Sequence, residues 1–287
     1  MNRSKIQLLG AMGIFGTIGV FVKYLPVPSA SLAFFRGVMG VAFLLICMLA
    51  TGQKPDTKAI RKNLWQLLIS GAAIGVNWIL LFEAYRYTTV ATATVCYYLA
   101  PLFLLLLSPL LGEKLTVKKL LCVLVALVGM VFVSGVMEGG LPAFSELKGI
   151  LLGIGAAILY ASVMLMNKKL SPIPAYDKTN MQLGAAALAI LPYLLIGGGF
   201  GIGGLTAWQW AIFIVLGIVH TGIAYALYFG SMKDLSSQTI AIFSYIDPVV
   251  AVLLSALVLR EPISLWGILG TVLILGSALF SELPDKR

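Results

Sequence analysis

Long apolar runs, separated by short polar segments, cover almost the whole chain. A helix needs about 20 residues to cross a hydrocarbon core of roughly 30 Å, because each residue advances it by about 1.5 Å. The pattern therefore predicts an all-α integral membrane protein with ten transmembrane helices. These are expected at 6–24, 28–50, 64–86, 88–110, 117–137, 147–167, 175–197, 207–231, 235–258 and 263–281. The first run is interpreted as an uncleaved helix, since no small-residue cleavage site follows it.

Composition supports this prediction. The chain is 60% hydrophobic and only 11% charged, whereas soluble domains are about half apolar and about a quarter charged. Its net charge of +9 does not indicate nucleic acid, because the basic residues lie in short gaps between apolar runs. Cys47, Cys96 and Cys122 lie inside apolar runs without a metal-binding spacing, so we expect no metal and no cofactor.

The basic residues also predict the orientation. With the N-terminus inside, the outer gaps hold only Lys23, Arg86, Lys148 and Arg260, while nearly all other Lys and Arg residues fall in cytoplasmic segments. This asymmetry predicts a multi-pass protein of the plasma membrane with both termini in the cytoplasm.

The chain repeats itself at an offset of about 147 residues. Residues 81–101 align with 227–248, which places Tyr98 opposite Tyr245 and Pro101 opposite Pro248. Downstream, Glu113 in GEKLT corresponds to Glu261 in REPIS, on opposite sides of the membrane. Each half, 1–140 and 141–287, therefore holds five helices. An odd number of spans inverts the second copy, and inverted repeats place a substrate site near the midplane.

Two prolines lie inside the predicted fourth and ninth helices. Pro101 and Pro248 each remove a backbone donor and clash with the preceding turn, so a kink is expected at both places. The kinks are interpreted either as a symmetric pair of hinges or as static bends.

Taken together, these motifs resemble a known family. FFRG at 34–37, AYRYTTV with LAP and GEKLT, and YIDPVVA with REPIS are similar to the drug/metabolite transporter superfamily, in its ten-helix EamA-type branch. The resemblance covers both halves. It implies secondary transport, often export, of amino acids and related metabolites, which is proton-driven in some members. The small four-helix members carry an acidic residue in their first helix, and this chain has none there, so their cation mechanism is not carried over.

Four ionisable residues inside the apolar runs are candidates for function, since charges in hydrocarbon are costly. Asp247 is interpreted as a proton acceptor or anchor for an ammonium group, or as a structural partner of Arg36. Arg36 itself is either a scaffold residue or a ligand for a carboxylate. Glu83 lines an outer vestibule or pairs with Arg36. His220 is a proton relay or a buried histidine bonded to a neighbouring helix.

Aromatic side chains accompany these groups along the sequence. Trp78, Tyr98, Tyr225 and Tyr245 are predicted to face one shared cavity, where rings suit an apolar side chain or an amine. The alternative is that they only pack helices together.

The sequence therefore predicts a secondary active transporter, an exporter of small polar, amine-bearing metabolites such as amino acids, that works by alternating access. Its expected partners are the substrate, the lipid bilayer and, where transport is coupled, protons. Assembly as a monomer or a homodimer is left open. The alternatives are an intramembrane enzyme that uses His220 and Asp247, and an uncoupled facilitator or channel. No ATP-binding motif is present, so a gradient must drive transport.

Overall fold

The computed structural model describes residues 3–22, 24–88, 90–133, 136–139, 144–197, 200–258 and 264–283. Helices make up nearly all of these ranges, and no strand occurs within them. They are α1 (Arg3–Val22), α2 (Ser29–Ala50), α3 (Thr57–Tyr87), α4 (Val90–Tyr97), α5 (Ala100–Leu107), η1 (Ser108–Leu111), α6 (Val117–Val133), α7 (Val136–Gly139), η2 (Phe144–Glu146), α8 (Leu147–Lys169), α9 (Ala175–Ile196), α10 (Ala207–Gly217), η3 (Ile218–Ile223), α11 (Ala224–Ser231), α12 (Ser237–Phe243), α13 (Ile246–Val258) and α14 (Leu265–Glu282).

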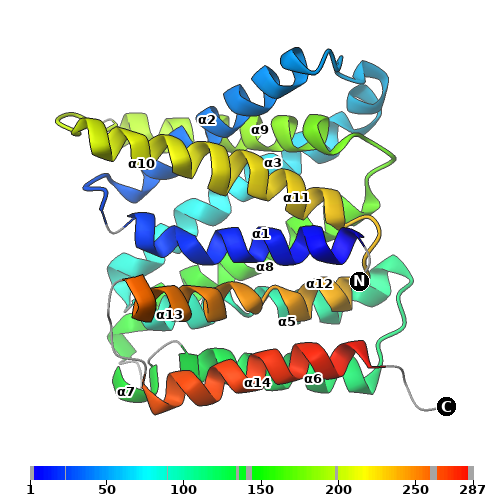
Figure 1. The fold of residues 1–287 in the computed structure, drawn as a ribbon, viewed down its shortest axis with the longest axis vertical. Coiled ribbons are helices and arrows are strands. Elements are labelled where there is room, and N and C mark those ends of the chain that lie inside the picture. The colour runs from blue at the N-terminus through cyan, green and yellow to red at the C-terminus, as the bar shows by residue number, and fades with distance from the viewer. Residues whose placement is uncertain are drawn as a thin grey trace.

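In the part of the chain described, these elements form ten rods, as the hydropathy pattern predicts (Figure 1). Three of the rods are composite: α4 continues through α5 into η1, α10 continues through η3 into α11, and α12 continues into α13. Seven rods are long and apolar enough to cross a membrane by themselves, and the shorter apolar helix α14 packs along α6. The fold is therefore an all-α bundle of ten membrane helices.

The neighbours of each helix reveal the two halves. α1 packs on α11 and α13, and its counterpart α8 packs on α3, α4 and α5. In the same way, α2 packs on η3, and its counterpart α9 packs on α3. Three further contacts join an element to its own counterpart in the other half: α2 with α9, α5 with α12, and α6 with α14. Exchanging the halves reproduces this set of contacts, so the bundle consists of two equivalent units of five rods.

Small residues allow the closest of these contacts. On α3, a Cβ added to Gly71 would lie 2.5 Å from the carbonyl oxygen of Gln182 and 2.6 Å from the Cβ of Ala185, both on α9. On α1, a Cβ at Gly16 would lie 2.6 Å from the backbone oxygen of Asp247. Glycine at these places lets backbones approach within van der Waals distance, as membrane helices often require.

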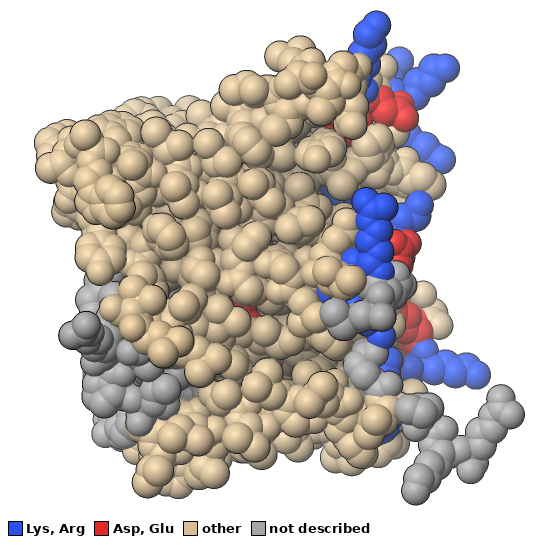
Figure 2. All heavy atoms as spheres, in the orientation of Figure 1, with Lys and Arg blue, Asp and Glu red and all other residues tan. Residues whose placement is uncertain are grey.

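Most of the charge on the face shown in Figure 2 gathers at one end of the bundle. There Lys, Arg, Asp and Glu lie along the edge where both termini lie, and the broad surface beside it is almost free of charge. Large apolar side chains are exposed along the rods, among them Ile46, Trp65, Leu188 and Leu279. We call the charged edge the basic end.

Among the described helix boundaries, one differs from the prediction by more than four residues. The third helix was expected to begin at residue 64, but α3 begins at Thr57. The carboxylate of Asp56 accepts a hydrogen bond from the backbone nitrogen of Ala59 and caps the helix. The added turns carry Lys58, Arg61 and Lys62, so hydropathy alone places them outside the span.

Candidate functional site

The predicted fourth and ninth helices are interrupted at equivalent positions. α4 and α5 are separated at Tyr98 and Leu99, and α12 and α13 are separated at Ser244 and Tyr245. At each interruption a backbone hydrogen bond reaches the third residue back, whereas an α-helix uses the fourth. Leu99 N donates to Cys96 O at 3.2 Å, and Tyr245 N donates to Ile242 O at 3.2 Å. Each break comes shortly before the proline, which lacks the donor needed to continue the regular ladder. Pro101 and Pro248 therefore lie at breaks, while their action as hinges stays a prediction.

The two breaks are joined through side chains. The Tyr98 hydroxyl donates to Oδ2 of Asp247 at 2.8 Å, and the Tyr245 hydroxyl donates to the backbone oxygen of Tyr98 at 2.9 Å. The tyrosine rings, counterparts in the two halves, lie 6.2 Å apart in a stacked arrangement. A carbonyl oxygen at a helix break is thus satisfied from the other half of the protein, as an apolar environment requires.

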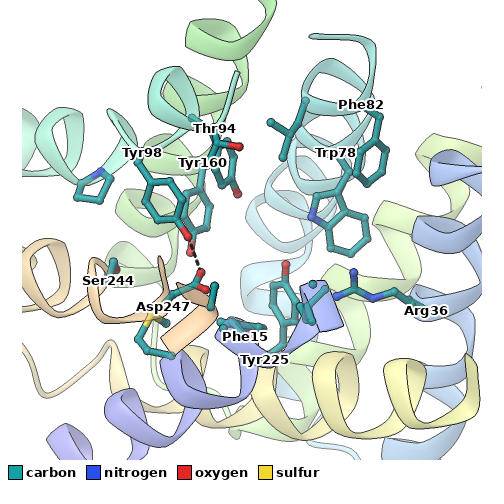
Figure 3. A pocket seen from close by; sticks show the side chains of 18 residues that line it. Phe15, Arg36, Trp78, Phe82, Thr94, Tyr98, Tyr160, Tyr225, Ser244 and Asp247 are labelled. Carbon is teal, nitrogen blue, oxygen red and sulfur yellow. Dashed lines mark hydrogen bonds between the residues drawn. The ribbon is translucent and has the colours of Figure 1, made fainter. Parts of the chain in front are cut away.

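A cavity of about 340 Å³ lies beside this junction. Both halves line it, through side chains on α1, α2, α3, α4, α8, α11 and α13. Its polar lining includes Asp247, Tyr98 and Ser244 on one side and Arg36 on the opposite side, with Trp78 and Tyr225 near Arg36 (Figure 3). The cavity can therefore present a carboxylate and a guanidinium to one bound molecule, with aromatic rings along its walls.

The cavity occupies the half of the bundle away from the basic end. Along α1, which begins at the basic end, the lining residues run from Met12 to Gly19. Along α3, which also begins there, they lie close to its opposite end, at Trp78, Leu81 and Phe82.

Arg36 is held by the central rod of the second half. Its Nε donates to the Thr221 hydroxyl at 3.0 Å, and its Cζ lies 5.9 Å from the centroid of the Trp78 ring. The Thr221 hydroxyl donates to Leu216 O, five residues earlier, within the π-helical turn η3. π-helical turns inside α-helices are frequent at functional sites. Here the turn places a hydroxyl acceptor against the guanidinium.

Two predicted ion pairs are not found. Arg36 and Asp247 lie on opposite sides of the cavity and form no ion pair with one another. The interpretation of Asp247 as a structural partner of Arg36 is therefore wrong for this structure. Glu83 does not pair with Arg36 either. Its carboxylate accepts hydrogen bonds from the Tyr193 hydroxyl and from Arg86, whose Nη1 is 3.2 Å away. These groups line a second cavity, of about 390 Å³, near the ends of α2, α3 and α9.

His220 lies away from the cavity. Its Nε2 is 2.6 Å from the Thr17 hydroxyl on α1, and its ring packs 5.0 Å from that of Phe21. His220 is not part of the cavity lining, so it does not share a site with Asp247. This placement matches the interpretation of a buried histidine bonded to a neighbouring helix. The alternative of an intramembrane enzyme requires His220 and Asp247 in one site, and the structure does not bring them together.

The aromatic predictions divide in two. Trp78, Tyr98 and Tyr225 line the cavity, whereas Tyr245 is fully buried behind it and is not among the lining residues. Tyr245 therefore supports Tyr98 and does not face the cavity as expected. The sequence analysis also missed lining residues, because a single ring or hydroxyl on an apolar helix does not indicate which neighbour it faces. These are chiefly Phe15, Phe82, Thr94 and Tyr160.

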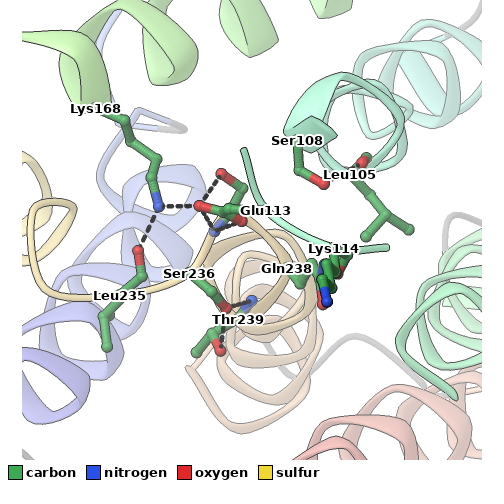
Figure 4. Close-up of polar contacts among 10 residues, drawn as sticks. Leu105, Ser108, Glu113, Lys114, Lys168, Leu235, Ser236, Gln238 and Thr239 are labelled. Atoms are coloured by element: carbon green, nitrogen blue, oxygen red, sulfur yellow. Dashed lines mark hydrogen bonds and ion pairs between the residues drawn. The ribbon is translucent and has the colours of Figure 1, made fainter. Parts of the chain in front are cut away.

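At the basic end, an ionic junction joins the two halves of the bundle (Figure 4). Glu113, just after η1, accepts from the backbone nitrogen of Ser237 at 2.9 Å and from its hydroxyl at 3.0 Å. Lys168, at the end of α8, lies 2.6 Å from the same carboxylate and also donates to Leu235 O. We call Glu113, Lys168 and Ser237 the inner junction. It ties the first half to the second below the cavity.

A ten-rod bundle with equivalent halves and a cavity between them is a polytopic membrane protein with the architecture typical of secondary transporters. The sequence model of the EamA-like transporter family matches residues 3–135 and again 147–282. The chain belongs to the EamA-like transporter family.

Individual relatives agree with this assignment. The chain is 32% identical over 272 residues to the uncharacterized transporter YxxF of Bacillus subtilis, covering 94% of this chain and 86% of that protein. It is 25% identical over 261 residues to the aromatic amino acid exporter YddG of Ancylobacter novellus, covering 88% of each. A solved crystal structure with 24% identity superposes with a TM-score of 0.86 over 98% of this chain and 97% of its own, which supports the fold.

Proposed function

We propose that this protein is a secondary active transporter of small zwitterionic metabolites, in the first place amino acids, with Asp247 and Arg36 as its charged anchors. The observation that carries the proposal is the cavity between the halves, with a carboxylate on one wall and a guanidinium on the other. A zwitterion with an ammonium group toward Asp247 and a carboxylate toward Arg36 would satisfy both.

The walls favour an apolar or aromatic side chain on such a substrate. Rings of Phe15, Trp78, Tyr97 and Tyr225 surround the space between the two charged groups, and rings bind apolar groups and cationic amines. Because one relative is named an aromatic amino acid exporter, aromatic amino acids are the first candidates and export is the first candidate direction.

The orientation completes the mechanism. Basic residues mark the cytoplasmic side of membrane proteins, so we place the basic end and both termini in the cytoplasm of a cell with this protein in its plasma membrane. The cavity then faces outward while the inner junction closes the cytoplasmic side. Transport follows when the halves rock so that the cavity is closed outside and opened inside.

Counterflow into proteoliposomes tests the proposal. Vesicles loaded with unlabelled L-phenylalanine or L-tryptophan should accumulate the labelled compound, with saturation, and phenethylamine and 3-phenylpropionate should compete poorly because each satisfies only one anchor. Stronger competition by 3-phenylpropionate than by the amino acids would overturn the zwitterion site. One relative, 26% identical over 183 residues and covering 62% of this chain, is named a biotin transporter, so biotin belongs in the same screen.

Coupling is measured in the same vesicles. We expect an imposed pH gradient to drive accumulation of the amino acid against its own gradient, with Asp247 as the group that carries the proton. Equal rates with and without the pH gradient would instead assign the protein as an uncoupled facilitator.

A further inference from the structure

A second, smaller cavity lies at the basic end, apart from the transport cavity. Its volume is about 100 Å³, and it lies between the end of α8, the start of α9 and the end of α11. Lys168, Lys178 and Lys233 all line it, together with the amide of Asn167. A water needs roughly 10–15 Å³ measured in this way, so the cavity has room for a group of several heavy atoms.

One of these lysines is buried without a carboxylate partner. Lys178 is 5% exposed, and its Nζ donates to the backbone oxygen of Phe229 at 2.6 Å. In the described part of the chain, neither Lys178 nor Lys233 has an Asp or Glu within ion-pair distance. Burying an ammonium group is costly unless it is paired, so an anion beside Lys178 would stabilise its charged form.

The nearby acidic residues are already engaged elsewhere. Glu113 neutralises Lys168 within the inner junction. Asp177 accepts a hydrogen bond from the backbone nitrogen of Asp56, and Asp234 accepts one from the Ser4 hydroxyl. No Asp or Glu is among the described lining residues, so the lining keeps an excess of positive charge from Lys178 and Lys233.

A buried amide in the lining points to a ligand as well. Asn167 is 4% exposed, and its Oδ1 has no hydrogen-bond partner, while its Nδ2 donates to Val163 O. A buried polar atom without a partner costs free energy, and a bound group that donates a hydrogen bond would satisfy it.

From these contacts we infer that the cavity lined by Lys168, Lys178, Lys233 and Asn167 is an anion site that binds a phosphate group. Ammonium groups supply charge and donors for phosphate oxygens, and a protonated phosphate oxygen or a headgroup hydroxyl can donate to Asn167. The group comes either from free inorganic phosphate or from the headgroup of an anionic lipid, which basic pockets at the cytoplasmic side commonly bind.

Thermal unfolding of the purified full chain tests this site with inorganic phosphate as the ligand. Potassium phosphate should raise the unfolding midpoint by about 3 °C or more relative to potassium chloride of equal ionic strength. The rise should disappear in Lys178→Met and shrink in Lys233→Ala. It should persist in Lys62→Met, which removes an exposed lysine of the same end that lies outside the cavity.

A second arm distinguishes the two sources. In nanodiscs of phosphatidylcholine alone, phosphate should stabilise the protein as it does in detergent. If the site takes a lipid headgroup, added phosphatidylglycerol should stabilise the protein further only when Lys178 is present, and it should abolish the effect of phosphate. A phosphate effect that survives phosphatidylglycerol assigns a free anion.

The inference is overturned if phosphate gives no rise beyond chloride, or if the rise is the same in Lys178→Met, Lys233→Ala and the parent protein. Should Lys178→Met fail to fold, Lys233→Ala carries the comparison, because Lys233 is exposed and its removal leaves the core intact. The outcome is independent of the proposed transport function, since no transport is measured.

Discussion

The asymmetry of the two halves is set by a few single residues. Asp247 has Ala100 as its counterpart in the first half, so only one wall of the junction carries a carboxylate. Its partner is the Tyr98 hydroxyl at 2.8 Å, and no cation among the described residues lies within ion-pair distance. A carboxylate in this position can be satisfied by an incoming ammonium group or by a proton, which is the basis for its proposed role.

Replacement of Asp247 by Asn should therefore remove transport while preserving the fold. Hydrogen bonds to charged groups contribute about 1.5–3 kcal/mol, so we expect substrate affinity to fall by roughly tenfold to one hundredfold. Radiolabel binding and counterflow measure the loss. Asp56→Asn is the matched control, because Asp56 caps α3 outside the cavity and Asn also caps helices. Asp247→Asn with unchanged affinity and unchanged response to pH would contradict the anchor.

The sequence identifies the charged and aromatic residues of the site better than it identifies which of their side chains face the cavity. Asp247, Arg36 and Trp78 stand out because polar or amphipathic residues interrupt apolar runs, and all three line the cavity. His220 stands out equally but faces Thr17 on α1. Periodicity along one helix cannot say which neighbour a side chain meets, so the cavity could be predicted as a set of residue types and not as a geometry.

Helices as elements were predictable because lipid demands a fixed length of apolar chain. The breaks before Pro101 and Pro248 were also predictable, since proline lacks a donor wherever it stands. The π-helical turn at Thr221 was not predicted, and neither was the contact of Thr221 with Arg36, which joins residues 185 positions apart in the chain. The start of α3 at Thr57 is marked by the cap at Asp56. Hydropathy misses this start because the first turns of the helix are polar.

Close packing between elements gives a second prediction. Gly71→Val on α3 should separate α3 from α9 and destabilise the protein by about 1–3 kcal/mol, because its side chain would overlap Gln182 and Ala185. The control is Gly13→Val on α1, where nothing lies within 4 Å of an added Cβ. Unfolding midpoints in detergent measure both. A Gly71→Val protein as stable as the Gly13→Val protein would contradict the close α3–α9 contact.

The whole molecule is organised by what joins its halves at each end. Away from the basic end the halves enclose the cavity, whereas at the basic end Glu113 of the first half holds Ser237 and Lys168 of the second. Gln238 adds a bond from its Nε2 to Lys114 O at 2.6 Å. Glu261, the predicted counterpart of Glu113 on the opposite side of the membrane, lies outside the described residues.

Because the inner junction is an ionic contact that spans the halves below the cavity, its removal should shift the protein toward a state that is open at the basic end. Glu113→Gln abolishes the ion pair with Lys168 and weakens the contacts to Ser237, each of which is charge-assisted. A loss of about 1.5–3 kcal/mol corresponds to a shift of roughly tenfold to one hundredfold between two states.

Spin labels at Lys114 and Lys233, two exposed positions on opposite halves of the basic end, report that shift in a background without cysteine. The parent protein should give one short distance, and Glu113→Gln should add a longer one whose share falls when ligand favours the outward-facing state. Asp56→Asn, an acidic residue of the same end outside the junction, should leave the distribution unchanged. If Glu113→Gln keeps the single short distance, Glu113 only caps α12, and opening must be governed by apolar contacts between the halves.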